Sequence, residues 1–327
     1  MRLLGKTNLK VYEVGLGGIP IQRVNQETVN EIINKMYSLG MNFIDTARAY
    51  TNSETLLGNA LKGKRSAFIL ATKSMAKTYE AMKEDINISL KNLQTTYIDI
   101  YQIHNPKKGS DLSGPLKALK EAQSEEKIKH IGITNHSKEY LEELITTDDF
   151  STIQFPYNFL EAQGEELFKQ AYQKNLGIII MKPLAGGMID NGALALKYIM
   201  KNPYISVAIP GMGSVDEVIS NYSYRKDEFT EEELLYIKNL RDEVKQDFCH
   251  RCGYCLPCPQ GIDIPLIFTF EAYYRRYGLA KWAQERYDSL VAKASSCLAC
   301  GACEARCPYQ LHIIDKLKKV DTLFKKD

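Results

Sequence analysis

Short apolar segments recur between Met1 and Arg225, and their spacing restricts the fold more than any other feature of the sequence. After a first segment at Val11–Leu16, the later ones end near positions 45, 72, 104, 134, 155, 181 and 209, at nearly regular intervals. Each interval can hold one strand and one helix with short connections. Segments such as Gly177–Met181 are almost wholly apolar, as in parallel strands that are covered on both faces. The sequence therefore predicts eight strand–helix units.

The simplest architecture for eight such units is a closed (β/α)8 TIM barrel over residues 1–225. An open doubly wound sheet is the alternative, but no G-x-G-x-x-G follows the first segment. The first helix is expected to begin after Asn25 and to end at Gly40, because the apolar residues between them fall on one helical face. The expected strands are Val11–Leu16, Asn42–Asp45, Ala67–Thr72, Ile98–Ile103, Ile128–Thr134, Ile153–Phe155, Gly177–Met181 and Ile205–Ile209.

Polar residues stand at the C-terminal ends of three neighbouring strands. Asp45 ends the second, Lys73 directly follows the third and His104 the fourth, while Tyr50 lies shortly after Asp45. Taken singly, a lysine or histidine at such a place is more often a surface or structural residue. In a barrel, however, the C-terminal ends of all strands meet at one mouth, where catalysis occurs. We expect these four side chains to form one catalytic site.

The chemistry of these four residue types is complementary. A tyrosine hydroxyl has a pKa of about 10, which makes it a weak acid at neutral pH. The nearby ammonium of Lys73 favours the phenolate and lowers that pKa. Asp45 keeps the lysine charged and in place, and His104 orients a carbonyl group or relays a proton. The set predicts that Tyr50 protonates a carbonyl oxygen as hydride arrives at the carbon.

All eight cysteines lie between Cys249 and Cys307, in two runs. The second run has the spacing C-x2-C-x2-C-x3-C-P of bacterial ferredoxins, and the first is one residue shorter before its last cysteine. Because a cysteine before proline ligates the other cluster in two-cluster ferredoxins, we expect two 4Fe–4S clusters with crossed ligation. Zinc is the main alternative, and disulfides would need an oxidising compartment. One cluster would take Cys249, Cys252, Cys255 and Cys307, and the other Cys297, Cys300, Cys303 and Cys258.

From residue 1 to 225 the sequence resembles the aldo/keto reductase family. The segment Asp45-Thr-Ala-x-x-Tyr50-x-x-Ser-Glu-x-x-Leu-Gly58 is similar to the family signature, and the resemblance implies the same tetrad of Asp45, Tyr50, Lys73 and His104. With the cysteine runs included, the chain resembles the branch that carries a C-terminal ferredoxin-like domain. The resemblance also implies NAD(P)H-binding residues: Asn135 and Gln154 at the nicotinamide carboxamide, Lys182, Pro183, Leu184, Gly186 and Gly187 at the pyrophosphate, and Gly211, Ser214 and Asn221 at the adenosine.

Two positions depart from the family pattern. Met181 stands where many members place an aromatic residue against the nicotinamide, and Glu217 stands where many place an arginine for the 2′-phosphate of NADPH. A carboxylate at Glu217 would repel that phosphate, so NADH is at least as good an expectation as NADPH. Because hydride transfer moves two electrons and a 4Fe–4S cluster passes one, a bound flavin such as FMN is a further possibility.

These features give one expected function and two alternatives. The expected function is an oxidoreductase that reduces a small carbonyl compound, or oxidises an alcohol, with NAD(P)H, while the clusters exchange electrons with a protein partner. The first alternative is a ferredoxin-linked reductase that uses a flavin or radicals without nicotinamide. The second is a non-catalytic redox-sensing or interaction module. The substrate and the oligomeric state stay open.

Composition limits the partners and the compartment. A net charge of +2 argues against nucleic-acid binding, and the aromatic residues of 264–294 are expected to form a helical core instead. No apolar stretch reaches the roughly 18 residues that mark a membrane-spanning helix, and the N-terminus has no signal-peptide pattern. No membrane segment and a cytoplasmic location are therefore expected. The predicted organisation is a barrel at 1–225, a linking helix at 226–247 and a small α-helical ferredoxin-like domain at 248–327.

Overall fold

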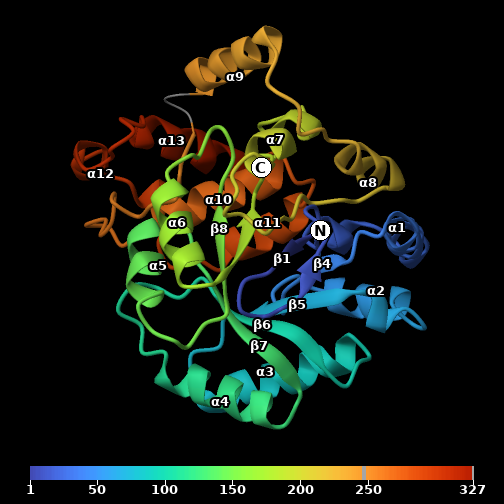
Figure 1. Cartoon of the computed structure of the whole chain (residues 1–327). Coiled ribbons are helices and arrows are strands. Elements are labelled where there is room, and N and C mark those ends of the chain that lie inside the picture. The colour runs from blue at the N-terminus through green and yellow to red at the C-terminus, as the bar shows by residue number, and fades with distance from the viewer. Residues whose placement is uncertain (245–247, 326–327) are drawn as a thin grey trace. The chain divides into compact units, whose positions relative to one another are not determined.

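The computed structural model describes residues 1–244 and 248–325 and divides into two compact units (Figure 1). The first contains Met1–Ala185 and Ile189–Asp227, and the second contains Gly186–Met188 and Glu228–Asp327. Among the described residues, no helix is long and apolar enough to span a membrane.

The first unit contains a parallel eight-stranded sheet in the order β10-β9-β8-β7-β6-β5-β4-β3. Parallel bridges from Val14 to Ala208 and from Gly17 to Gly211 join its two edges, so the sheet closes. The predicted (β/α)8 barrel is thus confirmed and the open sheet is excluded. The strands are β3 (Leu16–Gly17), β4 (Phe43–Asp45), β5 (Ile69–Ser74), β6 (Ile98–His104), β7 (Ile128–Thr134), β8 (Thr152–Pro156), β9 (Gly177–Met181) and β10 (Val207–Ala208).

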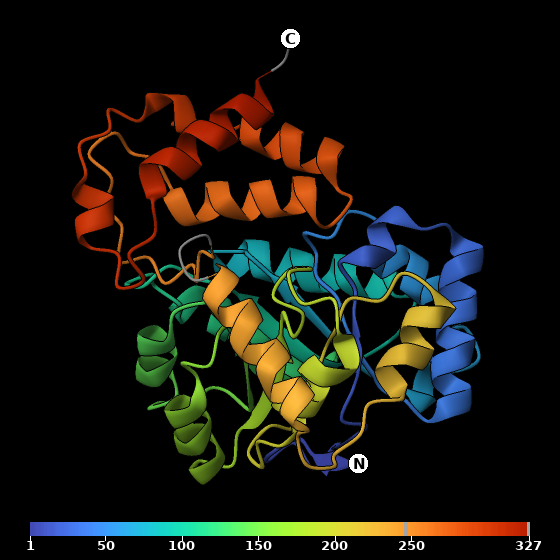
Figure 2. The same cartoon turned by 90° about the horizontal axis from the view of Figure 1, so that it is seen from above.

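Eight helices follow the strands and surround them (Figure 2). The Asn25 side chain accepts the Thr28 N–H, and Gly40 ends the first helix with φ = 70°, as the sequence predicts. The helices are α1 (Gln26–Leu39), α2 (Ser53–Ala60), α3 (Tyr79–Asn92), α4 (Ser113–Ser124), α5 (Lys138–Leu144), α6 (Glu165–Gln173), α7 (Gly192–Met200) and α8 (Val215–Tyr222), with 3-10 turns at Pro20–Arg23 and Arg65–Ala67.

The expected first strand, Val11–Leu16, is wrong as a single element. Lys10–Val11 is β2, which pairs antiparallel with β1 (Arg2–Leu3), whereas Leu16 pairs parallel with Ile44. The chain bends at Glu13, which hydrogen bonds from Arg2, Tyr224 and Lys226 hold in place. Burial alone would raise the pKa of Glu13, but the bonds from Lys226, Tyr224 and Arg2 lower it to about 2.

The β1–β2 hairpin packs under the N-terminal ends of the strands. Leu4 and Val11 are buried with strand residues that include Phe43 and Ile179, which fill the interior of the barrel. Gly5 forms an antiparallel bridge with Leu176, and a Cβ at Gly5 would lie only 2.3 Å from the Gly177 nitrogen. A side chain there would force the hairpin away from the barrel.

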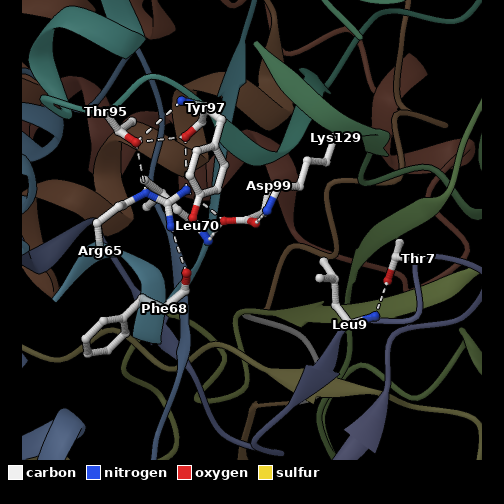
Figure 3. Close-up of polar contacts among 9 residues, drawn as sticks. All are labelled: Thr7, Leu9, Arg65, Phe68, Leu70, Thr95, Tyr97, Asp99 and Lys129. Atoms are coloured by element: carbon white, nitrogen blue, oxygen red, sulfur yellow. Dashed lines mark hydrogen bonds and ion pairs between the residues drawn. The ribbon is translucent and has the colours of Figure 1, made fainter. Parts of the chain in front are cut away.

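A polar cluster around Asp99 ties three strands together near their N-terminal ends (Figure 3). Asp99 is the second residue of β6, whereas His104 is the last. The Asp99 carboxylate accepts hydrogen bonds from Arg65 at 2.7 Å, Lys129 at 2.9 Å and the Leu70 N–H at 3.0 Å. The Tyr97 ring has the Arg65 guanidinium 4.3 Å and the Lys129 ammonium 4.0 Å from its centroid. At this end of a barrel such a network serves stability.

The change Asp99→Asn is expected to lower the free energy of unfolding by about 2–3 kcal/mol, because an amide replaces a buried carboxylate that three donors share. Lys129→Met is the matched control; its half-exposed ammonium should contribute less than about 1 kcal/mol. Urea unfolding of the three proteins checks the prediction, and equal losses in both variants would contradict it.

The second unit is helical in its described part. Phe268, Phe270 and Tyr287 are buried with Ile313 and Phe324, and α10 contacts both α11 and α13 (Figure 2). The aromatic segment therefore forms a core, as predicted. The helices are α9 (Glu231–Val244), α10 (Ile264–Arg275), α11 (Ala280–Asp288), α12 (Ala302–Ala305) and α13 (Ile313–Phe324), with a 3-10 turn at Ala294–Ser296.

Candidate active site and cysteine-rich centre

The alternation of side chains along the strands determines which residues face the interior of the barrel. Phe43 belongs to the interior core and Ile44 to the core under the helices, so Asp45 faces inward again. The same alternation turns Lys73 inward after Ala71, and His104 inward after Ile100 and Gln102. The C-terminal ends of β4, β5 and β6 thus bring the predicted charged residues to one mouth.

Asp45 and Lys73 form a buried ion pair at this mouth. The Lys73 ammonium donates to Asp45 and, at 2.8 Å, to the Thr46 carbonyl, and both residues are at most 2% exposed. Burial lowers the pKa of Lys73, while the charges of Asp45 and Glu54 oppose that shift. A lysine whose proton is held less tightly is suited to share it with a neighbouring phenol.

Tyr50 and His104 lie next to this pair. The Lys73 nitrogen is 5.1 Å from the centroid of the Tyr50 ring, and the Tyr50 and His104 rings meet edge to face with centroids 6.1 Å apart. Tyr50 lies in the turn between β4 and α2, so the turn rather than a strand positions the phenol. The structure therefore brings all four predicted catalytic residues together.

His104 is neutral under most conditions. Burial, together with the charges of Lys73 and Lys182, lowers its pKa to about 3. Its Nδ1 is buried without a hydrogen-bond partner in the described part of the chain. A neutral imidazole keeps one N–H and one acceptor nitrogen, so it can hydrogen bond to a substrate oxygen and orient it.

The low pKa of His104 predicts a pH-dependent stability. The unfolded histidine gains a proton near pH 6.5, whereas the folded one does so only near pH 3. Stability is therefore lost as the pH falls from about 6.5 towards 3, at no more than about 1.4 kcal/mol per pH unit. Urea unfolding at pH 7, 6 and 5 should show a smaller loss in His104→Gln than in the native chain. An equal loss would contradict the assignment.

Two further residues support the pair, and the sequence reasoning gave them no role. Gln102 donates to Asp45 at 2.9 Å, and a Cβ at Gly132 would lie 2.9 Å from the Gln102 Cγ, so only glycine leaves room there. Glu54 is buried and accepts from Thr72, Ser89, Arg48 and Asn92. Gln102 lies two residues before His104 on β6, so both side chains face the interior of the barrel. This two-residue alternation is the sequence signal that could have identified Gln102.

The two residues predicted at the nicotinamide carboxamide already have partners within the chain. The Asn135 amide donates to the Pro106 carbonyl at 2.8 Å and accepts the Ser137 N–H at 2.8 Å. Gln154 donates to Asp45 at 2.8 Å. Asn135 directly follows β7 and Gln154 lies in the neighbouring strand β8, where it joins Lys73 and Gln102 as a hydrogen-bond donor to the Asp45 carboxylate.

The segment predicted at the pyrophosphate has an unusual backbone. Lys182, Ala185, Gly186 and Gly187 all have positive φ, at 53°, 49°, 70° and 84°. Non-glycine residues rarely adopt this region, and such conformations gather at ligand-binding sites. Pro183 and Leu184 lie within the same turn, before the Ala185 N–H that donates to the Lys182 carbonyl.

The segment predicted at the adenosine forms the start of α8. Ser214 is its N-cap and accepts the Glu217 N–H, while the Glu217 carboxylate accepts the Gly213 N–H at 2.5 Å. The carboxylate therefore occupies the N-terminus of α8, where backbone N–H groups favour a negative charge. Gly211 packs against Pro20, and a Cβ at Gly192 would lie 3.2 Å from the Asn221 side chain.

Four of the cysteines line one pocket in the second unit. Cys249, Cys252 and Cys255 come from the first run and Cys307 from the second, with Phe248 and Phe268 beside them. The rings of His250 and Tyr309 stack with centroids 3.7 Å apart, which joins the start of the first run to the end of the second. The pocket thus contains the four ligands that crossed ligation requires for one cluster.

The chemistry of this pocket suits a cationic metal cluster. Burial, with the neighbouring Cys249 and Cys252, raises the pKa of the Cys255 thiol to about 12, and burial also raises the pKa of Cys249. Thiolates there need a compensating positive charge, which iron supplies. In residues 1–244 and 248–325, no three His, Cys, Asp or Glu side chains are close enough to hold a single metal ion. Ligands of a cubane bind separate irons and stand further apart.

The second run differs in exposure. Cys300 is exposed and Cys303 is buried, while Leu298 between the first two cysteines of that run is 71% exposed. Cys258 and Cys297 are partly exposed. Solvent therefore reaches Cys300 more easily than it reaches Cys255 or Cys303.

Comparisons with known proteins agree with both halves of this description. The aldo/keto reductase family model matches residues 13–193, and the 4Fe-4S dicluster domain model matches residues 248–312. An uncharacterized oxidoreductase, YqkF of Bacillus subtilis, is 24% identical over 75% of this chain and 97% of its own length. The NADH-specific methylglyoxal reductase of Escherichia coli is 26% identical over 60% of this chain and 70% of its own.

The solved structures give the same result. The aldo-keto reductase AKR11C1 from Bacillus halodurans, in its holo form, superposes with a TM-score of 0.65 and 26% identity over 73% of this chain and 95% of that one. A Klebsiella pneumoniae aldo/keto reductase in complex with NADP and acetate has a TM-score of 0.64 at 23% identity over 73% of this chain and 95% of that one, and so shares the fold. The chain belongs to the aldo/keto reductase family and carries a C-terminal 4Fe-4S dicluster domain.

Proposed function

We propose that the barrel reduces a small carbonyl compound with a nicotinamide cofactor, and that NADH is preferred to NADPH. The observation that carries this proposal is the buried Asp45–Lys73 pair, with Tyr50 and His104 beside it at one mouth of the barrel. An interaction module has no need of a charged lysine buried next to a phenol, because burial of that charge costs free energy.

Each residue has a separate part in the proposed reaction. The nicotinamide, when bound, supplies hydride to the carbonyl carbon. Neutral His104 orients the carbonyl oxygen towards the Tyr50 Oη, which donates its proton to that oxygen. The Lys73 ammonium stabilises the resulting phenolate. Asp45 holds Lys73 in place, and hydrogen bonds from Gln102 and Gln154 orient the Asp45 carboxylate. Oxidation of an alcohol uses the same groups in reverse.

The preference for NADH follows from Glu217. Its carboxylate lies at the N-terminus of α8, the segment that the family resemblance assigns to the adenosine. A 2′-phosphate brought to this place would meet a like charge, whereas a ribose hydroxyl would not. A similar relative, the methylglyoxal reductase of Escherichia coli, is described as NADH-specific.

The test is reduction of methylglyoxal by the anaerobically purified chain with each cofactor. We expect kcat/KM for NADH to exceed that for NADPH by about tenfold, which corresponds to about 1.4 kcal/mol of repulsion. Glu217→Gln removes the charge but keeps an oxygen that can accept the Gly213 N–H. It should therefore raise kcat/KM for NADPH and bring it closer to the value for NADH. A native preference for NADPH would show that the proposal is wrong about Glu217.

We propose that the second unit holds two 4Fe–4S clusters that exchange single electrons with a redox partner protein, while NADH alone supplies both electrons that reduce the carbonyl. Crossed ligation would place one cluster on Cys249, Cys252, Cys255 and Cys307, which the pocket supports, and the other on Cys258, Cys297, Cys300 and Cys303. The exposed Cys300 marks the second cluster as the one that a partner can approach. Cofactor analysis of the same preparation should release no flavin; a stoichiometric flavin would favour a flavin-linked reductase instead.

A further inference from the structure

Arg306 makes an unusual set of contacts between the two cysteine runs. Its Nη2 donates to the carbonyl oxygens of Cys255 and Pro257, each at 2.9 Å, and its Nη1 donates to the Leu256 carbonyl at 3.3 Å. Its Nε donates to the Ala302 carbonyl at 2.9 Å. One side chain thus uses all three guanidinium nitrogens to join three consecutive carbonyls of the first run to the helical turn of the second.

These contacts lie at the point where crossed ligation has to change clusters. In the first run, the three carbonyls lie between Cys255 and Cys258, which belong to different clusters in the proposed ligation. In the second run, Arg306 stands between Cys303 and Cys307, which also belong to different clusters. A residue that fixes the position of these two segments relative to each other determines whether the last cysteine of each run can reach the cluster of the other run.

We propose that Arg306 is a positioning residue for cluster assembly: it sets the register of the two cysteine runs, so that each run can give its last cysteine to the cluster of the other. This inference rests on the crossed ligation proposed above. A planar guanidinium can span several acceptors with fixed geometry, whereas a lysine offers one mobile ammonium. The requirement is therefore for arginine and not simply for positive charge.

The dependence on register leads to a specific expectation. Because each cluster draws ligands from both runs, loss of register should weaken both clusters together. If each cluster took all four ligands from one run, the register between runs would not matter to either. The loss of the three charge-assisted hydrogen bonds to the first run should lower the fraction of fully loaded chain about tenfold when a chelator competes for iron.

The experiment compares Arg306→Ala, Arg306→Lys and the control Arg275→Ala in the full chain after anaerobic reconstitution. Arg275 is half-exposed and pairs with Glu271 on its own helix, so its removal leaves the runs untouched. Iron and sulfide per chain and the electron paramagnetic resonance spectrum of the reduced protein are measured. The native chain and Arg275→Ala should load roughly eight irons. Arg306→Ala should lose the signals of both clusters in parallel. In Arg306→Lys the fraction of fully loaded chain should fall about threefold.

Reference spectra from Cys252→Ser and Cys300→Ser identify which cluster is lost. Native loading of Arg306→Ala, or loss of only one cluster, would overturn the inference. Thermal unfolding of the apo-proteins shows whether Arg306→Ala folds as Arg275→Ala does; if it does not, the folded Arg306→Lys variant decides by the same criterion.

Cys258→Ser separates this inference from the ligation on which it rests. Crossed ligation predicts that this change removes mainly the cluster of Cys297, Cys300 and Cys303. If it removes the cluster of Cys249, Cys252 and Cys255 instead, the ligation scheme is wrong and the role of Arg306 falls with it. If Cys258→Ser behaves as predicted while Arg306→Ala loads normally, only the role of Arg306 is wrong.

Discussion

Tyr50→Phe is expected to lower kcat/KM for carbonyl reduction by about 10³-fold while leaving the binding of NADH unchanged. The substitution removes one hydroxyl, and general acid catalysis by a well-placed group is worth about 10²–10⁴ in rate. The ring itself stays, with its edge-to-face contact with His104 and the Lys73 ammonium beside it. The loss should therefore appear in kcat and not in the folding of the chain.

Steady-state kinetics, with NADH binding measured separately by fluorescence, checks this prediction. Tyr37→Phe is the matched control, because that ring is about half exposed on α1 and lies outside the site. If Tyr50→Phe retained activity within about threefold of the native chain, Tyr50 would not be the proton donor. If the variant also retained the cellular role of the protein, a redox-sensing function would replace the proposed catalysis.

Asp45→Asn is expected to destabilise the barrel by about 3–5 kcal/mol, because it leaves the Lys73 charge buried without its partner. The remaining ammonium would release its proton more readily, since burial already lowers the pKa of Lys73 and the opposing charge of Asp45 is gone. Activity should fall as well, because a neutral lysine no longer stabilises the phenolate of Tyr50.

A double-mutant cycle separates the pair from its surroundings. Lys73→Met removes the charge and keeps most of the volume, so Asp45→Asn combined with Lys73→Met should cost clearly less than the sum of the two single changes. Unfolding of the barrel in urea is measured for the native chain, the two single variants and the double variant. All four proteins are prepared without clusters. A coupling energy below about 1 kcal/mol would show that the two residues act independently.

Strand positions and candidate catalytic residues could be predicted from the sequence because both depend on local periodicity. Side chains alternate between the two faces of a strand, and a helix between successive strands makes all strands run in the same direction. Asp45, Lys73 and His104 therefore all face the interior at one mouth of the barrel. The bend at Glu13 escaped this reasoning. Its cause is a set of hydrogen bonds from Arg2, Tyr224 and Lys226, and the last two residues come from the segment that follows α8, at the other end of the barrel sequence.

The sequence by itself determined the strand–helix repeat, the polar residues at the strand ends and the ligand spacing of the cysteines, because each depends on near neighbours along the chain. The tertiary structure alone decided that Gln102 and Gln154 share Asp45, that burial keeps His104 neutral, and that Arg306 reaches across to the first cysteine run. Hydrogen-bond partners and desolvation depend on which distant segments pack together, and no local pattern records that packing.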